Sequence, residues 1–198
     1  MTTTTTSTAS KTFSLPPCPP EQLTVHYSEE QLKTRIRELG NEINTVYKNS
    51  KRLVVIVVLK GAIHFASDLL RTIDLPCQVE FIRLASYGDA QTSSGTVKAV
   101  DLSLPSLSGE DVLVVEDIID TGLTLRFLLD YLGSALHTPK SLRLAVLLDK
   151  KEARKADVKV DFTGFEIGNE FVVGYGLDFA GYYRNIPFIG VVPPSAQP

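Results

Sequence analysis

The chain has 198 residues, of which 43% are hydrophobic, and a formal net charge of -3. This length suits one domain with a real core, and the charge gives no reason to expect a nucleic acid or an anionic membrane as partner. Two cysteines are too few for a disulfide scaffold, no apolar run could form a transmembrane helix, and the Thr-rich start lacks the apolar stretch of a secretory signal. We therefore expect a cytoplasmic protein with free thiols.

The amino-terminal part predicts a tail followed by a helix. Residues 1–11 are rich in Thr and Ser and have no apolar periodicity, so we expect a disordered tail ahead of a single domain at 12–198. Ser28 and Gln31 fit a capping box, which marks the start of a helix. The apolar stripe of this helix recurs every three or four residues and consists of Leu32, Ile36, Leu39, Ile43 and Val46.

The next segments alternate between strand and helix patterns. The run LVVIVVL at 53–59 is continuously apolar and β-branched, which predicts a strand buried on both faces. A helix is expected at 61–71 and a strand at 78–87. Residues 89–96 are polar and contain Gly and Ser, which indicates an exposed loop, and 96–102 return as the second strand of that hairpin.

The second half continues the alternation. Strands are expected at 112–118 and 141–149, with a helix at 121–133 between them that ends at Gly133. Two shorter strands follow, in VDFTGFEI and EFVVGYG. Together the segments predict an α/β domain with a mainly parallel twisted sheet flanked by helices. In such sheets, ligands bind at the carboxyl ends of the strands.

One strand end carries the strongest chemical signal. Three carboxylates, those of Glu116, Asp117 and Asp120, lie close together in VVEDIIDTGLTL and repel one another unless a cation lies among them. The following residues offer hydroxyl donors, a glycine and a helix amino terminus, all suited to a phosphate group; these are Thr121, Gly122 and Thr124. A phosphorylated and polyhydroxylated ligand suits both the acidic residues and the phosphate-binding residues. Glu116 and Asp117 would bind ribose hydroxyls and hydrated Mg²⁺. The plainer alternative is that the segment ends a strand and Asp120 caps a helix.

This segment resembles the phosphoribosyl pyrophosphate signature of the type I phosphoribosyltransferases, and EDIIDTG resembles their hypoxanthine-guanine branch. Four further segments are similar to that family and follow its order: LKGAIHFASDLLR, ASYGDAQTSSG, LLDKKEAR and EFVVGYGLDFAGYYRNIPFIG. The resemblance extends from about residue 20 to about residue 193. It implies the type I phosphoribosyltransferase fold, with a small hood lobe from the amino-terminal segment and about 160–198, and a homodimer or homotetramer.

The resemblance also implies which residues bind phosphoribosyl pyrophosphate. Lys60 and Gly61 match the loop that holds the pyrophosphate, in which the peptide bond of the family can be cis. Ser86 and Tyr87 match the base of a loop that closes over the site. Leu123 departs from the pattern, because several family members carry lysine there. The full implied set is Lys60, Gly61, Ser86, Tyr87, Glu116, Asp117, Asp120, Thr121, Gly122, Leu123, Thr124 and Arg184.

By the same resemblance, the purine site consists of Ile118, Lys150, Phe171, Val172 and Asp178. Lys150 would donate to the 6-oxygen of the base, and the 6-amino group of adenine would leave that donor unpaired. Glu116 and Asp117 would hold one Mg²⁺, and Asp178 would hold a second Mg²⁺ through water and help to read the base. Arg154 matches a family position near Lys150, but no role follows for it. Taken alone, Lys150 is one of several exposed lysines and Phe171 an ordinary core residue.

The implied activity is purine salvage by a pentosyltransferase. It transfers the 5-phosphoribosyl group from phosphoribosyl pyrophosphate to N9 of hypoxanthine or guanine, giving IMP or GMP and pyrophosphate. Asp120 would exchange a proton with N7 as general acid and base. One alternative is a xanthine-preferring or broad 6-oxopurine enzyme. Another is a regulator that senses phosphoribosyl pyrophosphate and binds nucleic acid, against which the low net charge and the apparent purine site count.

Overall fold

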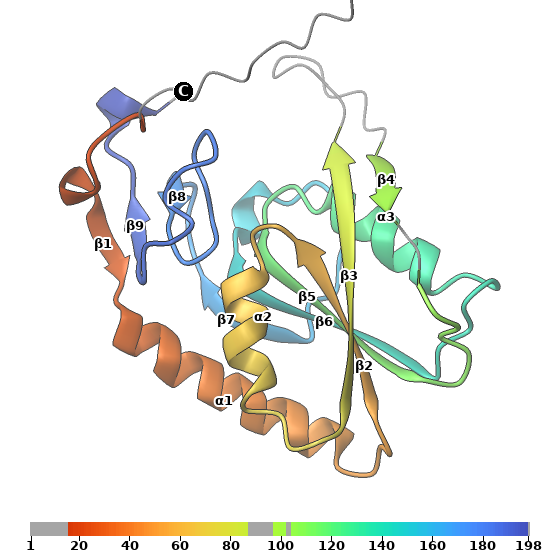
Figure 1. Cartoon of the computed structure of the whole chain (residues 1–198). Helices are drawn as coiled ribbons and strands as arrows, with labels where there is room; N and C mark the ends of the chain where they lie inside the picture. The colour runs from red at the N-terminus through yellow and green to blue at the C-terminus, as the bar shows by residue number, and fades with distance from the viewer. Residues whose placement is uncertain (1–15, 87–96, 102–103, 198) are drawn as a thin grey trace, which may run out of the picture.

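The computed structural model describes residues 16–86, 97–101 and 104–197, and for 85–86 and 97–101 it describes the backbone alone. Two sheets make up the architecture, a large one flanked by helices and a small one beside the carboxyl end of its strands (Figure 1). The predicted tail at 1–11 and the predicted exposed loop at 89–96 lie outside the described residues.

The large sheet has six strands in the order β4-β3-β2-β5-β6-β7. Strands β3, β2, β5, β6 and β7 are parallel, and β4 pairs antiparallel with β3 to complete the predicted hairpin. The bounds are β2 (Leu53–Leu59), β3 (Cys77–Ser86), β4 (Val97–Asp101), β5 (Asp111–Ile119), β6 (Ser141–Asp149) and β7 (Phe162–Glu166). The predicted strands are therefore confirmed, with small shifts at their ends.

The two faces of this sheet bury separate cores. Leu53, Val55 and Val57 of β2 pack with helices α1 (Glu29–Tyr47) and α2 (Ile63–Leu70). The alternate residues Val54 and Ile56 pack with α3 (Leu123–Leu132) on the opposite face. Since side chains alternate along a strand, a continuously apolar β2 is what burial on both faces requires.

Helix α1 begins as the sequence predicts, and its apolar stripe differs at one position. The Ser28 hydroxyl accepts a hydrogen bond from the Gln31 amide at 3.3 Å, and the Ser28 amide donates to Gln31 Oε1 at 2.9 Å, so the capping box is confirmed. The prediction that Val46 belongs to the stripe is wrong, because its side chain is 45% exposed and Tyr47 is buried instead. The spacing of a helix places the residue four after Ile43 on the buried face.

The small sheet, here called the hood sheet, has the order β1-β9-β8 and is antiparallel. It joins both ends of the chain: β1 is Thr24–Tyr27, β8 is Val172–Val173 and β9 is Ile189–Val191. Its own core includes Cys18, Val173 and Ile186. Strands β1 and β9 were not predicted, because segments this short carry little periodicity. The division into a tail and a single domain stays a prediction.

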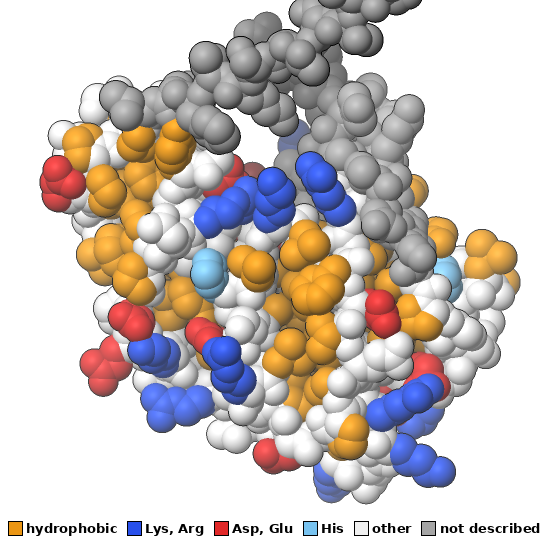
Figure 2. Space-filling model, viewed as in Figure 1, with side chains coloured by type: hydrophobic (Ala, Val, Ile, Leu, Met, Phe, Trp, Pro, Cys, Tyr) orange, Lys and Arg blue, Asp and Glu red, His pale blue; other side chains and the backbone are white. Residues whose placement is uncertain are grey.

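Short 3₁₀ helices lie at Pro20–Gln22, Lys151–Ala153 and Pro194–Ala196. Within the described ranges, no helix combines the length and apolar character needed to cross a membrane. Cys18 and Cys77 are both free, as the sequence predicts. The surface in Figure 2 gathers hydrophobic side chains over the region of α2 and β3, where Ile63 and Phe81 are exposed.

Candidate active site

The site lies where the direction of the chain diverges within the large sheet. From β2 the chain passes through α2 to β3 on one side, and from β5 it passes through α3 to β6 on the other. The carboxyl ends of two such neighbouring strands leave a crevice between the helices. A cavity of about 480 Å³ lies at this place. It is lined by Val58, Leu59, Gly61, Leu84, Glu116, Asp117, Ile118, Ile119, Asp120, Thr121, Gly122, Thr124, Leu125, Asp178 and Arg184.

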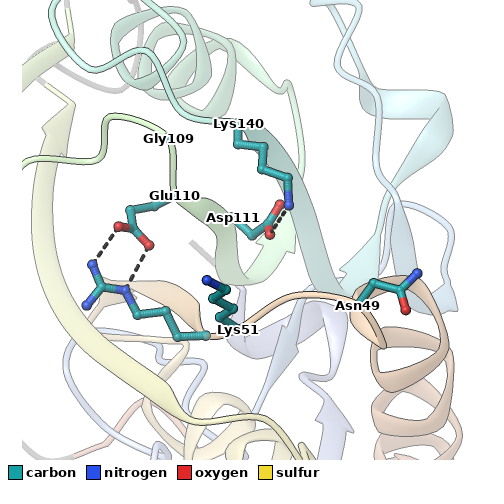
Figure 3. Close-up of a pocket in the computed structure, with 7 residues that line it drawn as sticks. Asn49, Lys51, Gly109, Glu110, Asp111 and Lys140 are labelled. Carbon is teal, nitrogen blue, oxygen red and sulfur yellow. Dashed lines mark hydrogen bonds and ion pairs between the residues drawn. The ribbon is translucent and has the colours of Figure 1, made fainter.

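A second cavity, of about 520 Å³, lies at the opposite edge of the sheet, among Lys51, Arg52, Glu110, Asp111 and Lys140 (Figure 3). Two of its cations are neutralised within the protein. Arg52 forms a two-pronged pair with Glu110, and Lys140 Nζ donates to Asp111 at 2.8 Å. These ion pairs join the amino ends of the strands. Because Arg52 and Lys140 are already paired with carboxylates, this cavity is a poorer phosphate site than the one at the carboxyl ends of the strands.

The acidic segment has the form the sequence predicts, except at the helix start. Strand β5 ends at Ile119, and Asp120 is exposed at the cavity. The N-cap of α3 is Gly122, with φ of 77° and no side-chain cap, so the alternative in which Asp120 caps the helix is wrong. The unbonded N–H groups of the first turn of α3 therefore lie beside the hydroxyls of Thr121 and Thr124, which is the arrangement that binds a phosphate.

Glu116 and Asp117 crowd two carboxyl groups at the end of β5. Burial, and then the neighbouring Asp117 carboxylate, raise the pKa of Glu116 well above its ordinary value. Asp117 is held by the Ile118 amide, which donates to its Oδ1 at 2.9 Å. A cation placed between the carboxylates would relieve this repulsion. Among the described residues no cluster of three or more His, Cys, Asp and Glu could hold a metal, so such a cation would need oxygens from water or ligand as well.

The loop after β2 approaches Asp117 so closely that only glycine fits. The Leu59–Lys60 peptide bond is cis, as the resemblance implies. A Cβ on Gly61 would lie 1.6 Å from Asp117 Oδ2. From the other side, a Cβ on Gly176 would lie 2.0 Å from the Gly61 carbonyl oxygen, and Gly176 has φ of 104°. Three segments distant in the sequence thus meet at Gly61.

Asp178 and Arg184 form the wall of the cavity that belongs to the carboxyl-terminal region. Arg184 Nη2 lies 2.5 Å from Asp178 Oδ1, and Arg184 Nη1 donates to the Gly176 carbonyl at 2.6 Å. The Gly181 amide donates to Asp178 Oδ2 at 2.8 Å. The carboxylate and the guanidinium are therefore both oriented before any ligand binds.

The structure brings together at this cavity Gly61, Glu116, Asp117, Ile118, Asp120, Thr121, Gly122, Thr124, Asp178 and Arg184. Other predicted residues lie near it without lining it. Lys60 is exposed in the loop before Gly61, and Leu123 is exposed as the first residue of α3. Ser86 ends β3, opposite Val97 of β4, and Tyr87 lies outside the described residues.

Of the predicted purine residues, Ile118 and Asp178 line the cavity, and Lys150, Phe171 and Val172 do not. Lys150 is half-buried, and its amide donates to the Ile119 carbonyl at 3.0 Å, which places its backbone against the end of β5. Phe171 meets Phe179 edge to face, with ring centroids 5.0 Å apart, and Val172 is buried in β8. Val58, Leu84 and Leu125 also line the cavity, although the sequence did not indicate them. Apolar residues in strands and helices carry no signal that separates a cavity wall from a core.

Comparison with known proteins agrees with this geometry. A family model described as the phosphoribosyl transferase domain matches residues 27–180. The hypoxanthine-guanine phosphoribosyltransferase of Bacillus subtilis (strain 168) is 45% identical over 168 residues, which cover 85% of this chain and 92% of that relative. The chain belongs to the phosphoribosyltransferase family, in its hypoxanthine-guanine branch.

Solved structures of this family share the fold. The hypoxanthine phosphoribosyltransferase of Staphylococcus aureus is similar with a TM-score of 0.84 and 37% identity, over 90% of this chain and 96% of that one. A variant of the Trypanosoma cruzi enzyme in a ternary substrates complex is similar with a TM-score of 0.82 and 38% identity, over 89% of this chain and 98% of that one. The predicted type I phosphoribosyltransferase fold with its hood is therefore confirmed.

The crowding of Glu116 predicts a dependence of stability on pH. A raised pKa in the folded state means that folding favours the protonated form, so the contribution is fully favourable below the ordinary value of 4.5 and is lost as the pH rises through the folded pKa. Glu116→Gln should therefore raise the melting temperature of the metal-free protein at pH 7, and the difference from wild type should shrink as the pH falls toward 4.5. Calorimetry across this range measures it.

The matched control is Glu152→Gln, which alters an exposed glutamate outside the cavity. It should change the melting temperature little at any pH in the range. A Glu116→Gln variant that is less stable than wild type at pH 7 would contradict the assignment of repulsion at this strand end.

Proposed function

We propose that this protein transfers the 5-phosphoribosyl group from phosphoribosyl pyrophosphate to N9 of hypoxanthine or guanine, forming IMP or GMP and releasing pyrophosphate. The observation that carries the proposal is the meeting of the Glu116–Thr124 segment, Gly61, Asp178 and Arg184 around one cavity at the carboxyl edge of the sheet. The curated relative from Bacillus subtilis is named for this activity. Purine salvage in the cytoplasm is the corresponding biological role.

The Asp120–Thr124 turn binds the 5-phosphate in this proposal. Thr121 and Thr124 donate through their hydroxyls, and the first turn of α3 offers free N–H groups and a favourable dipole. Leu123 contributes its backbone alone, because its exposed side chain does not line the cavity. Phosphate binding therefore needs no cationic side chain in the turn.

Glu116 and Asp117 bind the ribose hydroxyls and, through water, Mg²⁺. Carboxylate oxygens are the ligands that this hard cation prefers, so the two crowded carboxylates would hold it together with oxygens from water and substrate. Asp178, which also lines the cavity, would hold a second Mg²⁺ through water and help to read the base. When bound, the ion neutralises charge on the pyrophosphate leaving group.

The pyrophosphate lies between the Lys60–Gly61 loop and Arg184. Gly61 lets the backbone approach, and the guanidinium that Asp178 and Gly176 orient presents its fork to oxyanions. Ser86, the last residue of β3, and Tyr87 complete the set that binds phosphoribosyl pyrophosphate in this proposal.

The purine binds next to the loop that carries Lys150. Its other contacts are with Ile118, Phe171, Val172 and Asp178. The hydrogen bond from the Lys150 amide to Ile119 fixes the start of its loop directly after the acidic strand end. The Lys150 ammonium then donates to the 6-oxygen, and Phe171 stacks on the ring. A 6-amino group cannot accept that hydrogen bond, which is the basis of selectivity.

Asp120 acts as general acid and base. It is exposed at the cavity between the phosphate turn and the carboxylate pair, where the base would meet the ribose. As N9 attacks and the sugar passes through an oxocarbenium-like state, Asp120 exchanges a proton with N7. The carboxylates of Glu116 and Asp117 stabilise the positive character of the sugar.

A panel of four bases with phosphoribosyl pyrophosphate and Mg²⁺ tests the function. Hypoxanthine and guanine should give the highest kcat/KM, and adenine should be lower by about 10²-fold or more, because it leaves the Lys150 donor unpaired. Absorbance changes on nucleotide formation measure each rate. Xanthine as the best substrate would favour the broader 6-oxopurine alternative, and no turnover with any base would remove the proposal.

Asp120→Asn tests the acid and base. The variant should lower kcat by about 10²-fold or more while leaving the binding of phosphoribosyl pyrophosphate largely intact, since the amide keeps the shape but cannot exchange the proton. Steady-state kinetics and calorimetric titration separate the two effects. Normal turnover by this variant would show that another group moves the proton.

We also propose that the protein is a homodimer or homotetramer assembled through α2 and β3. Ile63 and Phe81 are 47% and 54% exposed. Val79 of β3 packs on the core beneath α1 and α2, and strand alternation places Phe81 on the same face, beyond the part that these helices cover. Large exposed apolar side chains of this kind are typical of an interface.

Phe81→Glu should lower the mass measured by sedimentation toward that of the 198-residue monomer, because a charge would be buried in the interface. Val25→Glu is the matched control, since Val25 is also 54% exposed but lies on the hood sheet. A monomeric wild type, or a Phe81→Glu variant of unchanged mass, would contradict this interface.

A further inference from the structure

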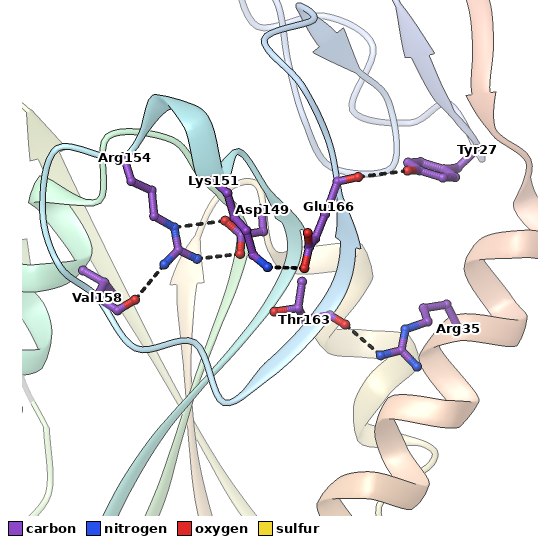
Figure 4. Close-up of polar contacts among 8 residues, drawn as sticks. All are labelled: Tyr27, Arg35, Asp149, Lys151, Arg154, Val158, Thr163 and Glu166. Atoms are coloured by element: carbon purple, nitrogen blue, oxygen red, sulfur yellow. Dashed lines mark hydrogen bonds and ion pairs between the residues drawn. The ribbon is translucent and has the colours of Figure 1, made fainter.

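Asp149 is the most deeply buried charged residue among those the structure describes, with an exposed fraction of 1%. It is the last residue of β6 and directly precedes Lys150. Arg154, at the end of the short turn that follows, donates from Nε to Asp149 Oδ1 at 3.0 Å and from Nη2 to Oδ2 at 2.5 Å (Figure 4). The two prongs close the turn 150–154 onto the strand that it leaves.

The remaining edge of the guanidinium is also used inside the protein. Arg154 Nη1 donates to the Val158 carbonyl at 2.7 Å. Each of its three nitrogens therefore has a protein acceptor, which suits a fixed structural position rather than direct contact with a substrate anion.

The same turn is attached to the phosphate-binding segment. At its start, the Lys150 amide donates to the Ile119 carbonyl at 3.0 Å. At its end, the Lys155 and Ala156 amides donate to the Thr121 carbonyl at 2.9 and 3.1 Å. The loop 150–156 therefore bridges the end of β5 and the Thr121 turn, and the Asp149–Arg154 pair holds it from beneath.

We propose that Arg154 is a positioning residue. Its pair with Asp149 fixes the loop that carries Lys150 against the phosphate turn, and so sets the affinity of the site for a 6-oxopurine. This inference rests on the proposed function and adds to it a residue for which the sequence suggested no role. Arg154 acts through Lys150 and does not touch the base.

The neighbouring ion pair shows why burial matters here. Lys151 of the same turn pairs with Glu166 at the end of β7, but both of these side chains are exposed (Figure 4). Exposed pairs are screened by water and contribute little, whereas a buried carboxylate needs its partner to remain charged. The planar fork of arginine also fits a carboxylate in two places, which an ammonium cannot do.

The test compares Arg154→Met with Lys151→Met as the matched control. Arg154→Met should raise KM for hypoxanthine by about 10-fold or more while kcat changes less, because positioning of the base is lost and Asp120 is untouched. Lys151→Met should leave both constants near wild type. Arg154→Lys should fall between wild type and Arg154→Met, since it restores charge without the fork.

A folding defect is separated from a positioning defect by two further variants. Asp149→Asn/Arg154→Met leaves no unpaired charge at this buried pair, so it should fold, as circular dichroism and its melting temperature would report. It should still show the raised KM. In a Lys150→Met background, the Arg154→Met change should add little to KM, because the lysine through which it acts is absent.

Unchanged KM for hypoxanthine in folded Arg154→Met or in the double variant would overturn the inference. So would full additivity with Lys150→Met. These outcomes are distinct from failure of the proposed function, in which the wild type itself would turn over none of the four bases.

Discussion

Repulsion between two carboxyl groups at the end of one buried strand is the constraint on which this structure depends. Glu116 and Asp117 lie near the end of β5, where burial and the neighbouring Asp117 carboxylate raise the pKa of Glu116. Folding tolerates this because the flanking parallel strands and the Asp117 hydrogen bond hold the segment in place. A cation bound between the two carboxyl groups would relieve this repulsion.

Close approach of backbone to that carboxylate pair explains how the surrounding segments are arranged. Gly61 lies against Asp117, and Gly176 lies against Gly61, so that no side chain separates β5, the loop after β2 and the carboxyl-terminal region. The contact brings Asp178 and Arg184, joined by their ion pair, to the cavity. A displacement of any of the three segments would therefore be felt by the other two.

On the other side of β5, backbone hydrogen bonds and a buried ion pair position the neighbouring loop. There the backbone of the 150–156 loop bonds to Ile119 and Thr121, and a buried ion pair at Asp149 supports the loop. Close contact thus joins the acidic strand end to the Lys60–Gly61 loop on one side and to the 150–156 loop on the other. This arrangement suits a reaction between two substrates that must meet over one strand end.

The sequence by itself determined the elements and the chemistry of the central segment. Continuous β-branched runs predict β2, β5 and β6, and the capping box predicts the start of α1, because these signals are local. The Glu116–Thr124 motif likewise contains its carboxylates and hydroxyls in one stretch. Only the tertiary structure decided that Gly122 rather than Asp120 caps α3, that Val46 faces solvent, and that Arg154 pairs with the buried Asp149. In each case the sequence leaves more than one local arrangement open, and the packing of the surrounding segments selects one of them.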